Sequence, residues 1–244
     1  MKRNTYVIGD IHGALRALKQ LMERVNPLKN DKLIFLGDYV DGWSESAQVI
    51  EYLIQLQKEY ECIFIKGNHD AWCEKWLENR LPDEMWLKNS GSSTVMSYSF
   101  VPEQEKEQHL AFLRNTKMYE TDGQNRLFIH AGYTSMHGPS HETYSTNYYW
   151  DRTLWEMAVC MDKRVAKDSK LYPKRLLLYK EIFIGHTPTL HYDIDVPMQG
   201  CNIWNIDTGA GFSGKLTAMN IDNKEFWQSD TCESLYPAEK GRNK

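Results

Sequence analysis

Histidine, aspartate and asparagine side chains follow short apolar runs at five places along this chain. The five clusters are Gly9-Asp10-Ile11-His12-Gly13, Gly37-Asp38-Tyr39-Val40-Asp41, Gly67-Asn68-His69-Asp70, His130-Ala131-Gly132 and Gly185-His186. Side chains of these types bind metal ions or move protons. The glycines beside them let the backbone turn sharply and approach a site closely. The five clusters therefore contain the candidate metal-binding and catalytic residues of the sequence.

The apolar runs before the clusters have the character of buried strands. They lie at residues 5–8, 33–36, 62–65, 127–129 and 182–184. Apolar residues at helical spacing over 15–25 and 47–56 separate the first three runs, which indicates parallel strands with right-handed crossovers. Ligand sites of such sheets collect at the carboxyl ends of the strands, so we expect all five clusters to meet in space.

The donor atoms in these clusters favour a particular kind of metal site. The candidate ligands are Asp10, His12, Asp38, Asn68, His130 and His186. Imidazole mixed with carboxylate and amide oxygen suits Mn, Fe, Zn or Ni, and it does not suit a zinc-thiolate site or an all-oxygen calcium site. Six ligands are too many for one tetrahedral ion. They fit two ions that share a carboxylate, and two ions roughly 3.5–4 Å apart can clamp phosphorus during in-line displacement.

The rest of the chain predicts how the site is enclosed. Residues from about 70 to 120 are mostly helical and polar, and His109 is expected on the surface of one such helix. Three alternating segments, 202–206, 215–219 and 225–228, predict antiparallel strands of a second sheet. We therefore expect an α/β fold, a two-sheet β-sandwich flanked by helices. Residues 1–244 would form a single domain, with helical insertions around 70–125 and 133–178.

Composition narrows the class of protein. The formal net charge is −4, with 41% hydrophobic and 25% charged residues, which suits a folded chain and not a nucleic-acid binder. No apolar run approaches the roughly 18 residues of a membrane span, and no signal peptide is visible. The five cysteines are odd in number and widely spaced, which argues against a disulfide framework. We expect a cytoplasmic protein without membrane or nucleic-acid partners.

In their order along the chain, the five clusters resemble the motifs of the calcineurin-like metallophosphoesterase superfamily. The resemblance covers about residues 5–215 and is greatest to the phosphoprotein-phosphatase branch, with bacterial and phage serine/threonine phosphatases and symmetrical dinucleoside-tetraphosphate hydrolases as nearer relatives. It implies two divalent or trivalent metal ions, with Mn ranked first and Fe, Zn or Ni as alternatives. In this family Asp10 and His12 would hold the first ion, Asp38 would bridge both, and Asn68, His130 and His186 would hold the second.

The same resemblance implies roles beyond metal binding. Hydroxide generated on the metals would attack phosphorus, His69 would protonate the departing oxygen as general acid, and Asp41 would orient His69. Asn68 would also contact substrate. One residue departs from the family pattern: Gly42 stands where the family has a phosphate-binding arginine, and Arg152 is the candidate to bind phosphate in its place.

The expected activity is that of a metal-dependent phosphoric ester hydrolase. We rank a phosphomonoesterase acting on phosphoserine or phosphothreonine proteins first, and a hydrolase of dinucleoside polyphosphates such as diadenosine tetraphosphate second. The substrate would be a phosphorylated protein or a small phosphate ester or nucleotide. A third possibility, from a different class, is an inactive metal-bound module that only binds phosphate. The presence of His69 and Asp41 beside a full ligand set argues against it.

Overall fold

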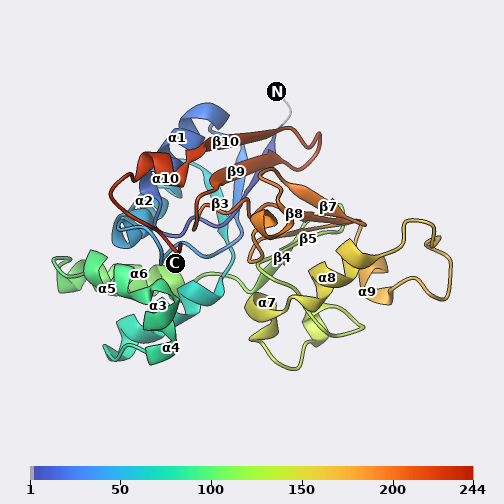
Figure 1. Ribbon diagram of the computed structural model, residues 1–244, viewed down its shortest axis with the longest axis horizontal. Helices are drawn as coiled ribbons and strands as arrows, with labels where there is room; N and C mark the ends of the chain where they lie inside the picture. Colours follow the sequence, from blue (N-terminus) through green and yellow to red (C-terminus); the bar gives the residue numbers. More distant parts are fainter. Residues whose placement is uncertain (1–2, 244) are drawn as a thin grey trace.

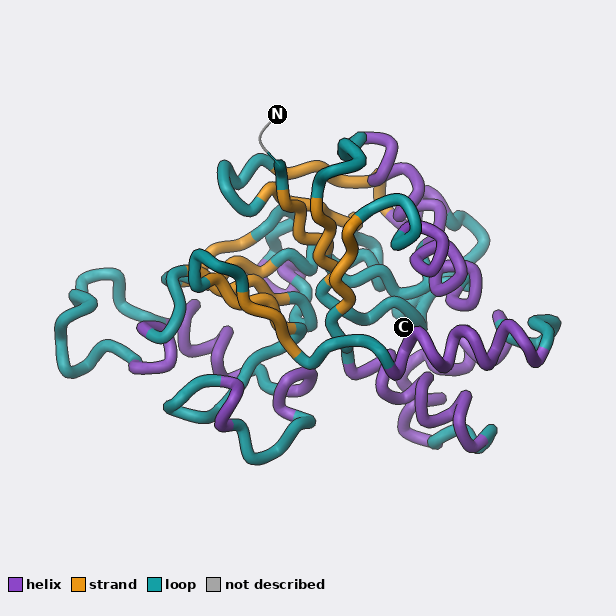
Figure 2. The backbone as a smooth tube through the Cα atoms, turned by 180° about the vertical axis from the view of Figure 1, so that it is seen from behind, coloured by secondary structure: helices purple, strands orange, loops and turns teal. Residues whose placement is uncertain are grey.

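Two five-stranded sheets form the centre of the protein, for which a computed structural model describes residues 3–243. In the first sheet the strand order is β10 (Phe226–Thr231), β9 (Lys215–Asn220), β1 (Thr5–Ile8), β2 (Lys32–Phe35), β3 (Glu61–Phe64). In the second it is β4 (Tyr119–Thr121), β5 (Arg126–Ile129), β6 (Glu181–Ile184), β8 (Ile203–Asn205), β7 (Met198–Gly200). The two sheets, orange in Figure 2, stack over each other between helices. The predicted two-sheet sandwich is confirmed.

Alternation along each strand explains why two sheets stack. Successive side chains point to opposite faces, so a strand that is apolar throughout serves two hydrophobic layers. Val7 of β1 and Phe183 of β6 pack in the layer between the sheets, whereas their neighbours Ile8 and Ile184 pack against the outer helices. Phe128 of β5 stacks on Phe183 with ring centroids 5.2 Å apart. The layer between the sheets thus fixes their spacing.

Helices cover the outer face of each sheet. Their bounds are α1 (Leu15–Val25), α2 (Ser46–Leu56), α3 (Asn68–Asn79), α4 (Glu84–Trp86), α5 (Ser92–Ser97), α6 (Glu103–Arg114), α7 (Asn147–Trp150), α8 (Thr153–Cys160), α9 (Lys174–Leu177) and α10 (Cys232–Leu235). In Figure 1 the green group α3–α6 and the yellow pair α7 and α8 lie on opposite sides of the lower half. Within the described part of the chain, no helix is long and apolar enough to cross a membrane.

Two predictions about local structure are wrong. Only one of the three C-terminal segments, β8, joins the second sheet, and it runs parallel to β6. The other two, β9 and β10, extend the first sheet antiparallel to β1, because the free edge of β1 accepts β9. His109 is buried, not on the surface, since its Nδ1 lies 2.9 Å from the Tyr98 hydroxyl and Glu51 faces its other nitrogen.

The layer between the sheets generates a stability prediction. Phe183→Ala removes a fully buried ring stacked on Phe128, so the free energy of unfolding should fall by about 3–5 kcal/mol. Phe226→Ala is the matched control, because that ring is 41% exposed and its loss should change stability by less than about 0.5 kcal/mol. Urea unfolding measures both values. Equal losses in the two variants would contradict this account of the inter-sheet layer.

Candidate metal centre and active site

The loops after five strands bring the predicted ligands together. β1, β2 and β3 run parallel in one sheet, and β5 and β6 run parallel in the other. Asp10 and His12 follow β1, Asp38 follows β2, Asn68 begins α3 after β3, His130 follows β5, and His186 follows β6. All six side chains are buried. The structure therefore brings the six predicted ligands together, as expected from their positions after the strands.

Asp38 lies at the middle of the cluster. One of its carboxylate oxygens, Oδ2, is 3.7 Å from His12 Nε2 and 3.4 Å from His130 Nε2. Two groups of potential ligand atoms, each within 4.8 Å, share Asp38: one with His12 and His69, the other with His130 and His186. A carboxylate common to two groups is what a bridged pair of ions requires.

The histidines present one nitrogen each to the site. His12 Nδ1 faces the backbone carbonyls of Val40 and Asp41, at 3.2 and 3.1 Å. His130 Nδ1 lies 2.7 Å from the carbonyl of Leu36, and its Nε2 is 3.3 Å from Asn68 Oδ1. A carbonyl that accepts the Nδ1 proton leaves Nε2 with its lone pair, which is the usual arrangement of a metal-binding histidine.

Asp10 offers an oxygen without a protein partner. Its Oδ2 accepts a hydrogen bond from the His186 amide at 3.0 Å, but its Oδ1 is buried without one. A buried unsatisfied carboxylate oxygen is costly unless a cation meets it. Gly185 is required here, because a Cβ at that position would lie 2.0 Å from Oδ1. The residues present thus fit a metal ion on chemical grounds.

Local backbone strain is concentrated at the same residues. His12, Asp38, Asp41 and His186 all have left-handed φ values, between 52° and 70°. Each such residue costs on the order of 1–3 kcal/mol and persists only where surrounding contacts hold it. Asp70 supplies some of those contacts: its carboxylate accepts the backbone N–H groups of Asp38, Tyr39 and Gly67 at 2.7–2.8 Å.

Charge in the cluster is strongly coupled. Burial opposes ionisation of Asp38, but His130 and His69 hold the pKa of its carboxyl well below the usual range. Burial likewise opposes a charge on His130, yet Asp38 and Asp10 raise its pKa to about 10. Burial and the nearby Asp207 raise the pKa of Asp10. The cluster is therefore a strong attractor of positive charge, whether as a proton or as a metal ion.

His69 and Asp41 form a separate pair beside the cluster. His69 Nδ1 lies 2.6 Å from Asp41 Oδ2, and both side chains are buried. Asp41 also accepts hydrogen bonds from Trp86 Nε1 at 2.6 Å and from Thr94 Oγ1 at 2.5 Å. A carboxylate fixed in this way orients the imidazole and stabilises its protonated form. The geometry therefore suits a proton donor at His69 Nε2.

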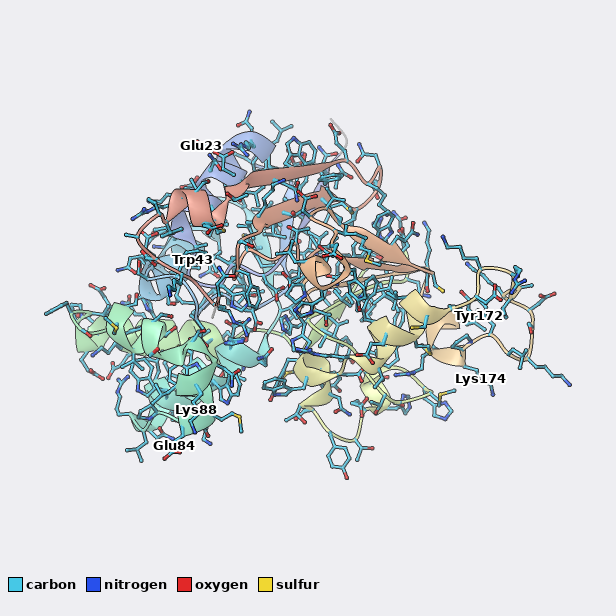
Figure 3. All side chains as sticks on the ribbon, viewed as in Figure 1. Glu23, Trp43, Glu84, Lys88, Tyr172 and Lys174 are labelled. Atoms are coloured by element: carbon cyan, nitrogen blue, oxygen red, sulfur yellow. The ribbon has the colours of Figure 1, made fainter. Side chains whose placement is uncertain are left out.

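A pocket opens over the cluster, and the two helical groups supply its walls. It is lined by Asp38, Asn68, His69, Trp72, Asn89, Trp150, Arg152, His186 and Arg242. The predicted substrate residues Asn68 and Arg152 both line it, and Arg152 Nε donates toward His186 Nε2 at 3.4 Å. Lys174, labelled in Figure 3, lies on a segment at the side of the molecule and does not line this pocket.

Two residues at the site were missed by the sequence reasoning. Asp207 lies beneath the cluster, where its Oδ2 is buried without a hydrogen-bond partner and burial raises its pKa to about 6. The Asp207 carbonyl accepts the Thr189 amide at 2.8 Å, so this segment also supports the loop that carries His186. Arg242, near the C-terminus, had no motif around it that could have signalled its place.

Residues 4–207 match the model of the calcineurin-like phosphoesterase family. The chain belongs to this family. The protein is accordingly a metal-dependent phosphoester hydrolase, and the resemblance seen in its motifs is confirmed.

Relatives of known name extend over nearly the whole chain. The chain is 26% identical to an asymmetrical bis(5'-nucleosyl)-tetraphosphatase, PrpE, of Oceanobacillus iheyensis, covering 90% of this chain and 89% of that protein. It is 24% identical to a symmetrical bis(5'-nucleosyl)-tetraphosphatase of Pseudomonas entomophila, covering 96% of each. A protein serine/threonine phosphatase structure from Saccharomyces cerevisiae shares the fold, with TM-score 0.63, 13% identity, and 99% and 84% of the two chains covered.

The buried cluster generates a prediction about metal loading. Mn²⁺ at about 100 times its Kd should stabilise the fold by about 2.7 kcal/mol, which raises Tm by roughly 5–10 °C. Because Mn²⁺ must displace the proton that Asp38 and Asp10 hold on His130, its Kd should be lower at pH 8.5 than at pH 6.5, so one fixed Mn²⁺ concentration should give the larger rise at pH 8.5. Differential scanning fluorimetry with Mn²⁺ or EDTA measures it.

His186→Gln should lose most of the Mn²⁺-dependent rise, whereas Asp162→Asn is the matched control at an exposed carboxylate and should keep it. An equal rise in both variants, or one that does not depend on pH, would contradict the assignment of this cluster as the metal centre.

Proposed function

We propose that this protein hydrolyses dinucleoside polyphosphates of the bis(5'-nucleosyl)-tetraphosphate class. The named relatives that match about 90% or more of both chains are tetraphosphatases of this kind. The sequence motifs favour a serine/threonine protein phosphatase first and a dinucleoside polyphosphate hydrolase second. The relatives support the dinucleoside polyphosphate hydrolase better, since the similarity to the yeast protein phosphatase is one of fold alone.

The observation that carries the proposal is a pair of indole rings at the pocket. Trp72 of α3 and Trp150 of α7 meet edge to face with ring centroids 5.0 Å apart, and both line the pocket above the cluster. Trp150 is 42% exposed although it is large and apolar. An exposed indole beside a phosphate site is a stacking platform for a nucleobase. A phosphoserine side chain has no group that would use it.

Each site residue has a role in the proposed reaction. Asp10, His12, Asp38, Asn68, His130 and His186 would hold two ions, for which manganese is our proposal. The ions would supply a water of lowered pKa and positive charge against the phosphate oxygens. Arg152 and Asn68 would bind the phosphate chain, because a guanidinium can donate two parallel hydrogen bonds to it. His69, held by Asp41, would give its proton to the departing oxygen.

The pocket over the metal cluster is narrow. Its lining comes from α3, from the turn at Asn89, from α7 and from the C-terminal segment, so the metal cluster is approached from a narrow space between side chains. A flexible polyphosphate chain can enter such a space while its bases remain at the rim.

We further propose that the whole polypeptide chain acts as one domain. The cytoplasmic location stays a prediction.

Substrate preference tests the proposal directly. The purified protein with Mn²⁺ should cleave diadenosine tetraphosphate with a higher kcat/KM than a phosphoserine peptide or p-nitrophenyl phosphate. Chromatography of the nucleotide products separates symmetrical cleavage, which yields two ADP, from asymmetrical cleavage, which yields ATP and AMP. Trp150→Ala should raise KM for the dinucleotide by roughly 5- to 100-fold, because base stacking contributes about 1–3 kcal/mol.

Trp150→Ala should leave KM for p-nitrophenyl phosphate within a factor of about two. Tyr144→Ala is the matched control, since that ring is 69% exposed in the same segment and does not line the pocket. Cleavage of the phosphopeptide in preference to the dinucleotide would overturn the proposal and would support a serine/threonine protein phosphatase instead. Metal binding without cleavage of any of the three substrates would support the inactive module.

The acid role of His69 gives a further prediction. With a poor leaving group such as the serine oxygen of a phosphopeptide, His69→Asn should lower kcat by about 10²- to 10⁴-fold. With p-nitrophenolate, which departs without protonation, the loss should be much smaller. His191→Asn, at an exposed histidine, is the control. Equal losses for both leaving groups would show that His69 does not act as the acid.

A further inference from the structure

The C-terminal segment returns to the active site. After α10 it contacts the segment that follows Asp41, and the described residues after α10 run near the middle of the molecule in both ribbon and tube views (Figures 1 and 2). Its residue Arg242 lines the same pocket as Arg152, His69 and Asn68. Nothing in the motifs of the chain assigns a role to this arginine.

The path of the segment is fixed at several points. Trp43, labelled in Figure 3, stacks on Tyr236 with ring centroids 4.9 Å apart. The carboxylate of Glu239 accepts hydrogen bonds from the amide and the hydroxyl of Ser44 at 3.0 and 2.8 Å. The Arg242 amide donates to the carbonyl of Gly211 at 2.8 Å. These contacts hold the backbone of the segment against the loop after β2.

The side chain of Arg242 is directed into the site by two glycines. A Cβ on Gly42 would lie 3.2 Å from its Cγ, and a Cβ on Gly211 would lie 3.1 Å from its Cδ. The guanidinium lies 5.1 Å from the ring centroid of Phe212, and Nη1 donates to His12 Nε2 at 3.1 Å. Among the described residues, Arg242 forms no ion pair with a carboxylate. Its charge is available to an anionic ligand.

The position next to Asp41 cannot itself supply this cation. Gly42 has φ +113°, and a Cβ there would lie 3.1 Å from the carbonyl oxygen of His12. Any side chain at position 42 is therefore strained in this backbone. The space that such a side chain would occupy is taken by the stem of Arg242.

We propose that Arg242 binds a phosphate group of the substrate, opposite Arg152. The proposal rests on the proposed function only in requiring a phosphate-bearing substrate. A guanidinium has five N–H donors, so the contact with His12 uses few of them. The lone pair of His12 Nε2 serves either Arg242 or a metal ion. If a metal ion occupied His12 Nε2, the guanidinium would give up that contact and its donors would be free for a ligand in the pocket, with the stem still held between Gly42 and Gly211.

Phosphate binding tests the proposal without turnover. Isothermal titration of the Mn²⁺-loaded protein with inorganic phosphate should show a roughly 10- to 100-fold weaker Kd for Arg242→Met, because a charge-assisted double hydrogen bond is lost. Methionine keeps the unbranched stem between the two glycines, so the segment should stay docked. Arg242→Lys should fall between the two, since an ammonium donates as a single point charge.

Lys240→Met is the matched control, because it removes a cation from the same segment at an exposed position outside the pocket. It should leave the Kd for phosphate unchanged. KM for diadenosine tetraphosphate should rise in Arg242→Met alone, and the urea midpoint of that variant should match that of the parent protein.

Three results would overturn the proposal. One is an unchanged phosphate Kd in Arg242→Met. Another is tighter Mn²⁺ binding with faster turnover in that variant, which would show that Arg242 inhibits the enzyme by blocking the metal-binding nitrogen of His12. The third is an equal loss in Lys240→Met. If the parent protein binds phosphate but cleaves no dinucleotide, the proposed function fails, and the phosphate Kd of Arg242→Met still decides the role of this arginine.

Discussion

The buried carboxylate of Asp38 is the point on which the two halves of the site depend. It faces His12 from the first sheet and His130 from the second, and its Oδ1 accepts the amide of His69 at 3.0 Å. Its own amide is held by Asp70. A carboxylate that is free of solvent and surrounded by imidazoles needs compensating positive charge. The left-handed backbone, the close glycines and the convergence of strand ends all serve to place this one group.

The strand ends and their ligands could be predicted because each is encoded locally. An apolar run of four residues followed by glycine and a polar ligand marks both a strand and the loop that it leads into, as at Leu33 to Asp38. The sheet partners of β9 and β10 could not be predicted in this way. Alternation shows that a segment is a strand, but it contains no information on which edge the strand will join.

Side chains far from the motifs were predicted least well. His109 lies on a helix with many charged neighbours, and only the tertiary contact with Tyr98 shows that it is buried. Arg242 follows a polar C-terminal stretch that looks like a solvated tail. Its placement depends on Trp43 and Ser44, some 200 residues earlier, so no local pattern could reveal it. The absence of a side chain at Gly42 and the position of the C-terminal segment are thus related, because the Arg242 stem lies where a side chain at position 42 would lie.

We propose that Asp38 would join two metal ions in one centre. Electron paramagnetic resonance of the protein loaded with Mn²⁺ tests it most directly, because two ions roughly 3.5–4 Å apart and sharing a carboxylate are magnetically coupled. The parent protein should show the signal of a coupled pair, and Asp38→Asn should lose it. A spectrum of isolated Mn²⁺ in the fully loaded parent protein would contradict a bridged dinuclear site.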